Sequence, residues 1–193
     1  MTVDRAAQRK RAPRQRILDT AYQLISRRGV RDVGVDEVIA KAGIAKATLY
    51  RHFPSKTDLV LAVLEQRERL WTLGLVEAEA RRRGATAEGR LLAVFDVFDE
   101  WFHSDRFDTC TFVNVLLEMR ATHVLGEASI RHLKNIRTVI TRLATEAGLR
   151  EPEEFARSWH ILMKGSIVSA AEGDTDAARR AQVMAADLIE QYR

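Results

Sequence analysis

The sequence predicts an all-α protein, and three observations lead to this fold class. Of its 193 residues, 46% are hydrophobic and only three are proline, a composition that favours helices around a globular core. Apolar residues recur at intervals of three and four along most of the chain, which is the period of an amphipathic helix. No segment keeps the alternation of apolar and polar residues that is typical of a half-buried strand.

The first helix is expected from near Pro13 to Arg28. Gly29 follows as a stop signal, because glycine readily leaves helical geometry. The apolar stripe of this helix consists of Ile17, Leu18, Ala21, Leu24 and Ile25. We expect the stripe to pack across the next two helices as a scaffold.

A helix-turn-helix is predicted next. One helix ends at Gly43, and a helix of roughly seven residues follows and ends near Phe53, because Pro54 disfavours helical geometry at the residue before it. Leu49 and Phe53 share one face at spacing i, i+4. The polar residues left on or near the exposed surface of this helix are Lys46, Thr48, Tyr50, Arg51 and His52.

Charge points to a polyanion as the partner of this end of the chain. Residues 1–60 hold 13 Lys and Arg against 6 Asp and Glu, whereas residues 61–193 hold 18 against 21. A basic N-terminal third suggests DNA binding, with residues 1–12 as a basic arm along phosphates or in a minor groove. The cations that precede or open the first helix are Arg5, Arg9, Lys10, Arg11, Arg14 and Arg16. A solvated helical hairpin with a charged tail is the alternative.

These residues resemble the DNA-binding domain of the TetR family of transcriptional regulators. The resemblance covers about residues 13 to 64 and rests on Gly29, residues 38–44 (VIAKAGI), residues 48–53 (TLYRHF) and residues 55–59 (SKTDL). It implies a three-helix helix-turn-helix domain followed by a helical ligand-binding and dimerisation domain. The family usually has Ser at the position of Ala45, where the hydroxyl caps the recognition helix, and commonly Gly at the position of Ala47.

Different roles are expected for the residues of the recognition helix. Lys46 and Thr48 lie near its start and are expected to reach base edges, while Tyr50, His52 and Lys56 hold phosphates. The full candidate DNA-binding set is Lys46, Ala47, Thr48, Tyr50, Arg51, His52, Lys56 and Arg14.

The rest of the chain is predicted to be helical. Residues 55–58 (SKTD) resemble a capping box and open a long connecting helix whose apolar residues include Leu59, Val63, Leu70 and Trp71. After a loop at residues 83–86, helices are expected around residues 91–102, 111–125, 127–147, 153–172 and 176–192. The predicted domains are the arm 1–12, the DNA-binding domain 13–58 and the ligand-binding and dimerisation domain 59–193.

Large apolar side chains in the middle helices suggest a pocket for a small molecule. Cys110, Asn114 and Glu118 lie one turn apart and add polar groups on one helix face. The candidate ligand-binding set is Trp71, Phe98, Trp101, Cys110, Asn114, Glu118, Trp159 and Met163. Plain core packing is the alternative for the aromatic residues, and an inert thiol is the alternative for Cys110.

The final two helices suggest a homodimer. Gly165, Ser169 and Gly173 recur every four residues and leave a low surface for close helix approach. Packing this pair against its copy would form a four-helix bundle, and the family resemblance implies the same arrangement. The candidate dimerisation set is Gly165, Ser169, Ile167, Gly173, Met184 and Leu188. An intramolecular core is the alternative use of these faces.

Several function classes find no support in the sequence. It has no Gly-rich phosphate loop, nucleophile elbow or metal-ligand spacing, so we expect no catalytic residues, no metal and no cofactor. A single cysteine, a charged N-terminus and the lack of a membrane-length apolar run predict a cytoplasmic protein. The expected function is a ligand-responsive repressor that a small molecule releases from a near-palindromic double-stranded operator. The alternatives are a helical small-molecule-binding protein without specific DNA binding and a transcriptional activator of the same fold.

Overall fold

The computed structural model describes residues 12–105 and 107–193, and across these residues every regular element is a helix. This confirms the predicted all-α fold class. The described residues form two compact units, one made of residues 12–67 and 111–130 and the other of residues 68–105, 107–110 and 131–193. The first unit therefore extends past the predicted boundary at residue 58 and includes a segment that the sequence assigned to the second domain. The predicted basic arm lies outside the described residues except for Ala12.

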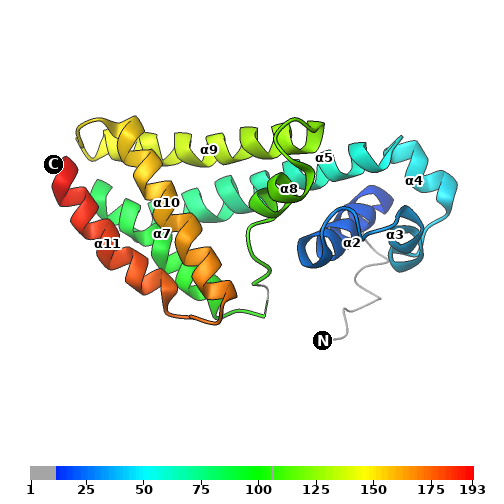
Figure 1. Ribbon diagram of the computed structural model, residues 1–193, viewed down its shortest axis with the longest axis horizontal. Helices are drawn as coiled ribbons and strands as arrows, with labels where there is room; N and C mark the ends of the chain where they lie inside the picture. The colour runs from blue at the N-terminus through cyan, green and yellow to red at the C-terminus, as the bar shows by residue number, and fades with distance from the viewer. Residues whose placement is uncertain (1–11, 106) are drawn as a thin grey trace. The chain divides into compact units, whose positions relative to one another are not determined.

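The first unit is built on α2 (Pro13–Arg28), α3 (Val35–Ala42), α4 (Lys46–His52) and α5 (Lys56–Arg67). α2 packs against α3, α4 and α5, and its stripe of Ile17, Leu18 and Ala21 is fully buried. α2 and α3 are drawn in blue in Figure 1, and α4 and α5 in cyan. The predicted bounds of the first helix and of the helix-turn-helix are confirmed.

Polar contacts fasten α5 to α2 inside this unit. The Gln15 side-chain amide donates to Asp19 Oδ1 at 2.7 Å and to Gln66 Oε1 at 2.8 Å. Gln66, which is buried, donates in turn to Asp19 Oδ1 at 3.2 Å. Because buried polar groups need partners, this triad specifies how the two helices meet.

The cap that opens α5 matches half of the predicted capping box. The Asp58 N–H donates to Ser55 Oγ at 3.1 Å, as the motif requires. The Ser55 hydroxyl then donates to the Asp58 carboxylate at 2.6 Å, which is a side-chain contact in place of the usual return to the capping backbone. The shorter Asp side chain accounts for this difference from a box closed by Glu.

The long helix after α5 changes its winding, which the sequence did not predict. α5 continues as η1 (Glu68–Glu77), a π-helix, and then as α6 (Ala78–Arg83). A π-helix bonds each residue to the one five positions away, so its side chains are rotated relative to an α-helical stripe. Thr72 and Val76 are buried in η1, whereas Leu70, predicted on the apolar stripe, is 58% exposed.

The second unit also contains α7 (Ala87–Phe102), α10 (Pro152–Ala171) and α11 (Ala177–Tyr192). α10 packs against α11, and α11 packs against α7, and the three lie side by side in green, orange and red (Figure 1). Thr86 begins α7 by accepting a hydrogen bond from the Gly89 N–H at 3.0 Å. The core between these helices is aromatic, with Phe95, Phe98 and Trp159 almost completely buried.

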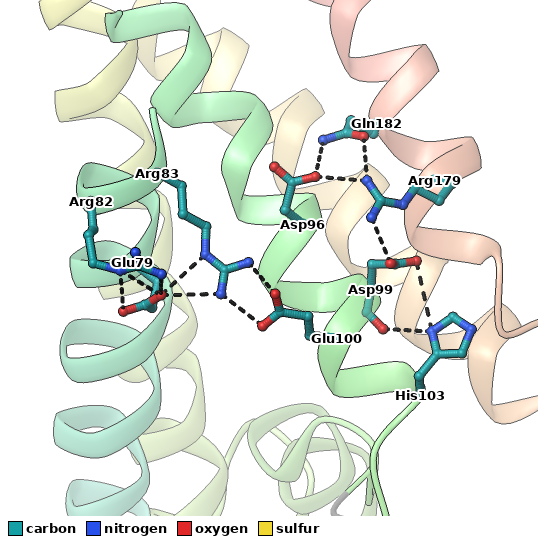
Figure 2. A network of polar contacts seen from close by, with 9 residues as sticks. All are labelled: Glu79, Arg82, Arg83, Asp96, Asp99, Glu100, His103, Arg179 and Gln182. Carbon is teal, nitrogen blue, oxygen red and sulfur yellow. Dashed lines mark hydrogen bonds and ion pairs between the residues drawn. The ribbon is translucent and has the colours of Figure 1, made fainter. Parts of the chain in front are cut away.

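A polar network on the surface of this unit ties α7 to helices on both sides (Figure 2). The Arg83 guanidinium of α6 donates to both Glu100 oxygens at 2.7 and 2.8 Å. On the other side, Arg179 of α11 donates to Asp96 and Asp99, each at 2.8 Å. Exposed ion pairs contribute only about 0–1 kcal/mol each, so the network fixes helix register more than it adds stability.

The bounds of the next two helices differ from the prediction. The sequence favoured a helix over residues 111–125, but α8 (Thr111–Met119) ends earlier and α9 (Val124–Glu146) begins before the predicted residue 127. Arg120 adopts a left-handed conformation with φ 67°, which breaks the helix. His123 Nδ1 then accepts the Leu125 N–H at 3.1 Å, so a polar side chain caps the start of α9. None of the described helices is long and apolar enough to cross a membrane.

Candidate DNA-binding surface

The turn between α3 and α4 has the geometry of a tight helix-turn-helix. Gly43 lies in the left-handed region with φ 62°, where a side chain would be strained. Its N–H donates to the Ala40 carbonyl and the Ile44 N–H donates to the Ile39 carbonyl, each at 3.3 Å. Ala45 already takes the extended conformation of a helix N-cap. Two residues therefore separate the end of α3 from the cap of α4.

Arg16 holds this turn from α2. Its Nε and Nη2 donate to the Ala42 carbonyl at 3.2 and 2.7 Å, and Nη2 also donates to the Gly43 carbonyl at 2.6 Å. A cation at the C-terminus of α3 satisfies carbonyls that the helix leaves unbonded, and it interacts favourably with the helix dipole. The sequence grouped Arg16 with the cations that precede or open the first helix and gave no signal that its guanidinium is used inside the unit.

The recognition helix α4 has one buried and one exposed face, as predicted. Leu49 is completely buried and Phe53, just after the helix, is 3% exposed. On the opposite side Lys46, Ala47, Tyr50 and Arg51 are exposed. Thr48, His52 and Lys56 are half-buried, which leaves their polar ends at the margin of this surface.

The N-cap of α4 lacks a side-chain hydrogen bond, as the residue type suggests. Ala45 offers no acceptor for the first free N–H groups of the helix, and its carbonyl accepts the Thr48 and Leu49 N–H groups at 2.9 and 3.3 Å. A missing cap typically costs about 1 kcal/mol. The start of α4 is therefore held by packing of Leu49 more than by its own end.

Two cations of the candidate set already have contacts. Lys46 Nζ lies 3.2 Å from Asp36 Oδ1, and both side chains are largely exposed, so this ion pair is weak and opens at little cost. The Arg14 guanidinium lies 5.2 Å from the centre of the Phe53 ring, within the range of a cation–π interaction. This contact places Arg14 at the end of α4.

Other cations of the unit are paired with a carboxylate in α3. Glu37 lies 3.0 Å from Lys41 Nζ and 2.8 Å from Arg28 Nη1. Hydrogen bonds from Lys41 and Arg28 lower the pKa of Glu37, and the bond from Lys41 has the larger effect. The positive charge of Arg28 and Lys41 is therefore partly compensated, whereas Arg51 lies on the exposed face of α4.

The residues predicted to bind a ligand fall into two groups. Trp71, Phe98 and Trp101 come together in the second unit, with ring centres 4.3 to 6.3 Å apart. Trp159 and Met163 are buried there too, at 0% and 3% exposure. All five side chains belong to the second unit, and their role toward a ligand stays a prediction.

The polar members of the predicted ligand set are divided between the two units. Cys110 belongs to the second unit and is half-buried, whereas Asn114 and Glu118 belong to the first. The Glu118 carboxylate accepts the backbone N–H groups of Val30 and Arg31 at 2.7 and 2.6 Å. Sequence periodicity placed the three residues on one helix face but gave no signal for this partner, which lies 88 residues away in the chain.

Most of the predicted dimerisation residues lie on the outer side of α10 and α11. Gly165 and Met184 are exposed, and Ser169 and Leu188 are half-buried. Ile167 is only 8% exposed and packs inside its own unit, and Gly173 lies in the loop after α10 with φ 108°. A surface groove of about 420 Å³ runs between the two helices, lined by Ser158, Ile161, Leu162, Met184, Asp187, Leu188 and Gln191.

Sequence reasoning missed three apolar residues on this outer side. Ile161 is 65% exposed, Val168 is 54% exposed and Val183 is 67% exposed. Ile161 and Val168 lie on the side of α10 opposite Trp159 and Met163, so the helix is apolar on two faces. That pattern was readable from the sequence, because Ile161 and Val168 are seven residues apart and therefore share a face of α10 that does not include Trp159 or Met163.

The chain is similar to known bacterial regulators over the helix-turn-helix. Residues 17–63 match the family model described as "Bacterial regulatory proteins, tetR family". The HTH-type transcriptional activator FasR of Mycolicibacterium smegmatis is 33% identical over 92 residues, which span 48% of this chain and 41% of FasR. The HTH-type transcriptional regulator SrpR of Pseudomonas putida is 38% identical over 55 residues, 28% of this chain and 26% of SrpR. Each match therefore spans less than half of the curated relative.

Similarity to solved structures extends along most of the chain. The crystal structure of a TetR-family transcriptional regulator from Streptomyces coelicolor matches with a TM-score of 0.85 and 27% identity. The match covers 93% of this chain and 95% of that protein. The helices that follow the helix-turn-helix thus share their arrangement with a known regulator as well.

Proposed function

Because the chain belongs to the TetR family of transcriptional regulators, we propose that it binds a near-palindromic operator as a homodimer and that a small molecule releases it. The observation that carries the proposal is the two-faced helix α4. Leu49 and Phe53 anchor it, and Lys46, Ala47, Tyr50 and Arg51 face outward at the end of a turn that Arg16 holds. Such a preformed helix can enter a major groove without refolding.

The proposed contacts follow from the order of residues along α4. Lys46, Ala47 and Thr48 occupy its first turn, and the first residues of a recognition helix reach base edges. Tyr50, Arg51 and His52 lie further along, and we assign them with Lys56 and Arg14 to phosphates, which fix register without reading sequence. The weak Lys46–Asp36 pair would open when a phosphate or base competes for the ammonium.

The proposed dimer uses the outer side of α10 and α11. A two-fold contact across this side would cover Ile161, Val168, Val183 and Met184, whose apolar surface is costly to leave in water. The same contact would bring together two proposed DNA-binding domains of residues 13–58, one from each copy of the chain. Recognition helices about 34–36 Å apart would then read successive major grooves.

The proposed effector site is in the domain of residues 59–193, near the aromatic cluster of Trp71, Phe98 and Trp101. Ligand binding there would favour a conformation whose recognition helices no longer match the operator spacing. The effector is a small molecule with an apolar body, because the side chains that would surround it are largely aromatic.

Genomic binding-site selection with the purified protein tests the proposal. Enrichment of sites with two inverted half-sites is expected, with affinity that falls steeply as salt rises, because phosphate contacts release counterions. Replacing Lys56 should weaken binding to all sequences, whereas replacing Thr48 should change the preferred base at one position. Equal binding to scrambled duplexes would contradict an operator-specific regulator.

An activator is the second candidate, and one observation favours it. The relative FasR is named an activator, and the match to it covers 48% of this chain. A reporter gene behind a selected promoter separates the two roles. Deleting the regulator raises transcription if it represses and lowers transcription if it activates.

A further inference from the structure

The turn after α2 presents two neighbouring backbone N–H groups to one carboxylate, which comes from a helix far away in the sequence. α2 ends at Arg28, and the N–H groups of Val30 and Arg31 both donate to Glu118 of α8, at 2.7 Å to Oε2 and 2.6 Å to Oε1. α8 packs directly against α2 within the first unit. Successive N–H groups that converge in this way form an anion-binding nest, and here the anion is part of the protein.

Gly29 is fitted to this carboxylate. A Cβ at position 29 would lie 2.7 Å from Glu118 Oε2 and 3.2 Å from Cδ, so a side chain would displace the carboxylate. Gly29 also has φ 85°, which side chains rarely adopt. A glycine at position 29 therefore allows the contact in two ways. It adopts the positive φ of the turn, and it leaves space for the Glu118 carboxylate.

The turn is also held by Arg28, the last residue of α2. Arg28 donates to the Asp32 carbonyl at 2.6 Å and to the Glu37 carboxylate at 2.8 Å. Val30 and Val33 are buried, which fixes the middle of the turn, and α3 begins soon afterwards at Val35. The position at which α3 starts therefore depends on contacts from both Arg28 and Glu118.

We propose that Glu118 is a positioning residue that fixes the start of α3, and with it the recognition helix, relative to α8. The inference rests on the proposed function, because it names the route by which the state of the second unit reaches the DNA-binding helices. The chain passes from Cys110 of the second unit directly into α8. A displacement of this nine-residue helix moves Glu118, and charge-assisted hydrogen bonds carry the displacement to the turn before α3.

Two variants and one matched control test the contact. Glu118→Ala removes both acceptors, and Glu118→Gln keeps one acceptor oxygen but places an N–H₂ group against the other N–H. Glu127→Gln is the control, because Glu127 is an exposed carboxylate in the same unit and its loss changes the net charge equally. The Gln variant also keeps the side-chain volume if the Ala variant fails to fold.

The first measurement is amide hydrogen exchange with amide chemical shifts. The Val30 and Arg31 amides are expected to exchange at least tenfold faster in both Glu118 variants, and the amide resonances of α3 and α4 should shift. The Glu127 variant should match the wild type. Unchanged exchange at Val30 and Arg31, or unmoved α3 and α4 resonances, would overturn the inference.

The second measurement is operator affinity at a temperature where each variant is fully folded. A role limited to stability would leave this affinity unchanged, whereas a positioning role predicts a loss of at least fivefold for Glu118→Ala and a smaller loss for Glu118→Gln. Wild-type affinity in a folded Glu118→Ala variant would refute the positioning role even if exchange increases. If the wild-type protein selects no DNA, the proposed function fails by itself, and the exchange and chemical shifts alone decide the positioning role.

Discussion

Arg16 offers the sharpest test of how the helix-turn-helix is held together, through the substitution Arg16→Ala. The guanidinium makes three hydrogen bonds to the carbonyls of Ala42 and Gly43. A hydrogen bond from a charged donor contributes about 1.5–3 kcal/mol. The Ala42 carbonyl is part-buried and cannot fully return to water, whereas the Gly43 contact is exposed. We assign the lower end of that range to the contact with Ala42 and a few tenths of a kcal/mol to the contact with Gly43. Arg16→Ala is therefore expected to lower the stability of the helix-turn-helix by about 2 kcal/mol.

Amide hydrogen exchange of α3 and α4 measures this loss directly. A loss of about 2 kcal/mol corresponds to exchange about 30-fold faster, because every 1.4 kcal/mol is a factor of ten. Arg27→Ala is the control, since Arg27 is an exposed arginine of the same helix; it should change exchange by less than about threefold. Equal exchange in the Arg16 and Arg27 variants would refute the role assigned to Arg16.

Three further predictions concern the recognition helix, a buried histidine and the outer side of α10 and α11. Ala45→Ser supplies the missing N-cap and should stabilise the start of α4 by about 1 kcal/mol, seen as slower exchange in its first turn; unchanged exchange would show that the hydroxyl forms no cap. Burial, with Lys164 and Arg137 nearby, lowers the pKa of His160 from 6.5 to about 3. Between pH 6.5 and pH 3 the imidazole of His160 therefore stays neutral in the folded protein, whereas it gains a proton in the unfolded chain. Unfolding free energy from urea titrations should therefore fall by about 2 kcal/mol between pH 7 and pH 5, and His160→Gln should remove most of this slope; a variant with the wild-type slope would assign it to other groups. Met184→Glu should shift the protein toward monomer in sedimentation experiments and lower its operator affinity. The control is Leu117→Glu, at a residue of α8 that is 75% exposed, and it should leave the dimer intact. A dimeric Met184→Glu variant would exclude the proposed interface.

Local sequence signals predicted the DNA-binding helices well. Pro13 and Gly29 mark the two ends of α2. Gly43 marks the turn after α3, and Pro54 marks the end of α4. These residues restrict backbone geometry by themselves, so their effect does not depend on distant parts of the chain. The inward faces of Leu49 and Phe53 followed from helical spacing alone.

Contacts between distant residues were not readable in the same way. Arg16 appeared to be one more cation at the start of the first helix, and Glu118 one more polar group on a helix face. Periodicity does not identify partners that are 26 or 88 residues away. The break at Arg120 and the π-helical winding of η1 were missed as well. Arg is not a usual stop signal, and the shift of Leu70 to the exposed side follows from the winding rather than from the residue.

The first unit is discontinuous in sequence, and this affects how the protein is synthesised and dissected. Its first segment ends at Arg67, and its second segment begins only at Thr111. A ribosome must release well over a hundred residues before Glu118 can meet the Val30 and Arg31 amides, so the nascent helix-turn-helix waits for a later part of its own unit. A fragment that ends after α5 would leave those two N–H groups to water, and its DNA affinity would report an incomplete unit.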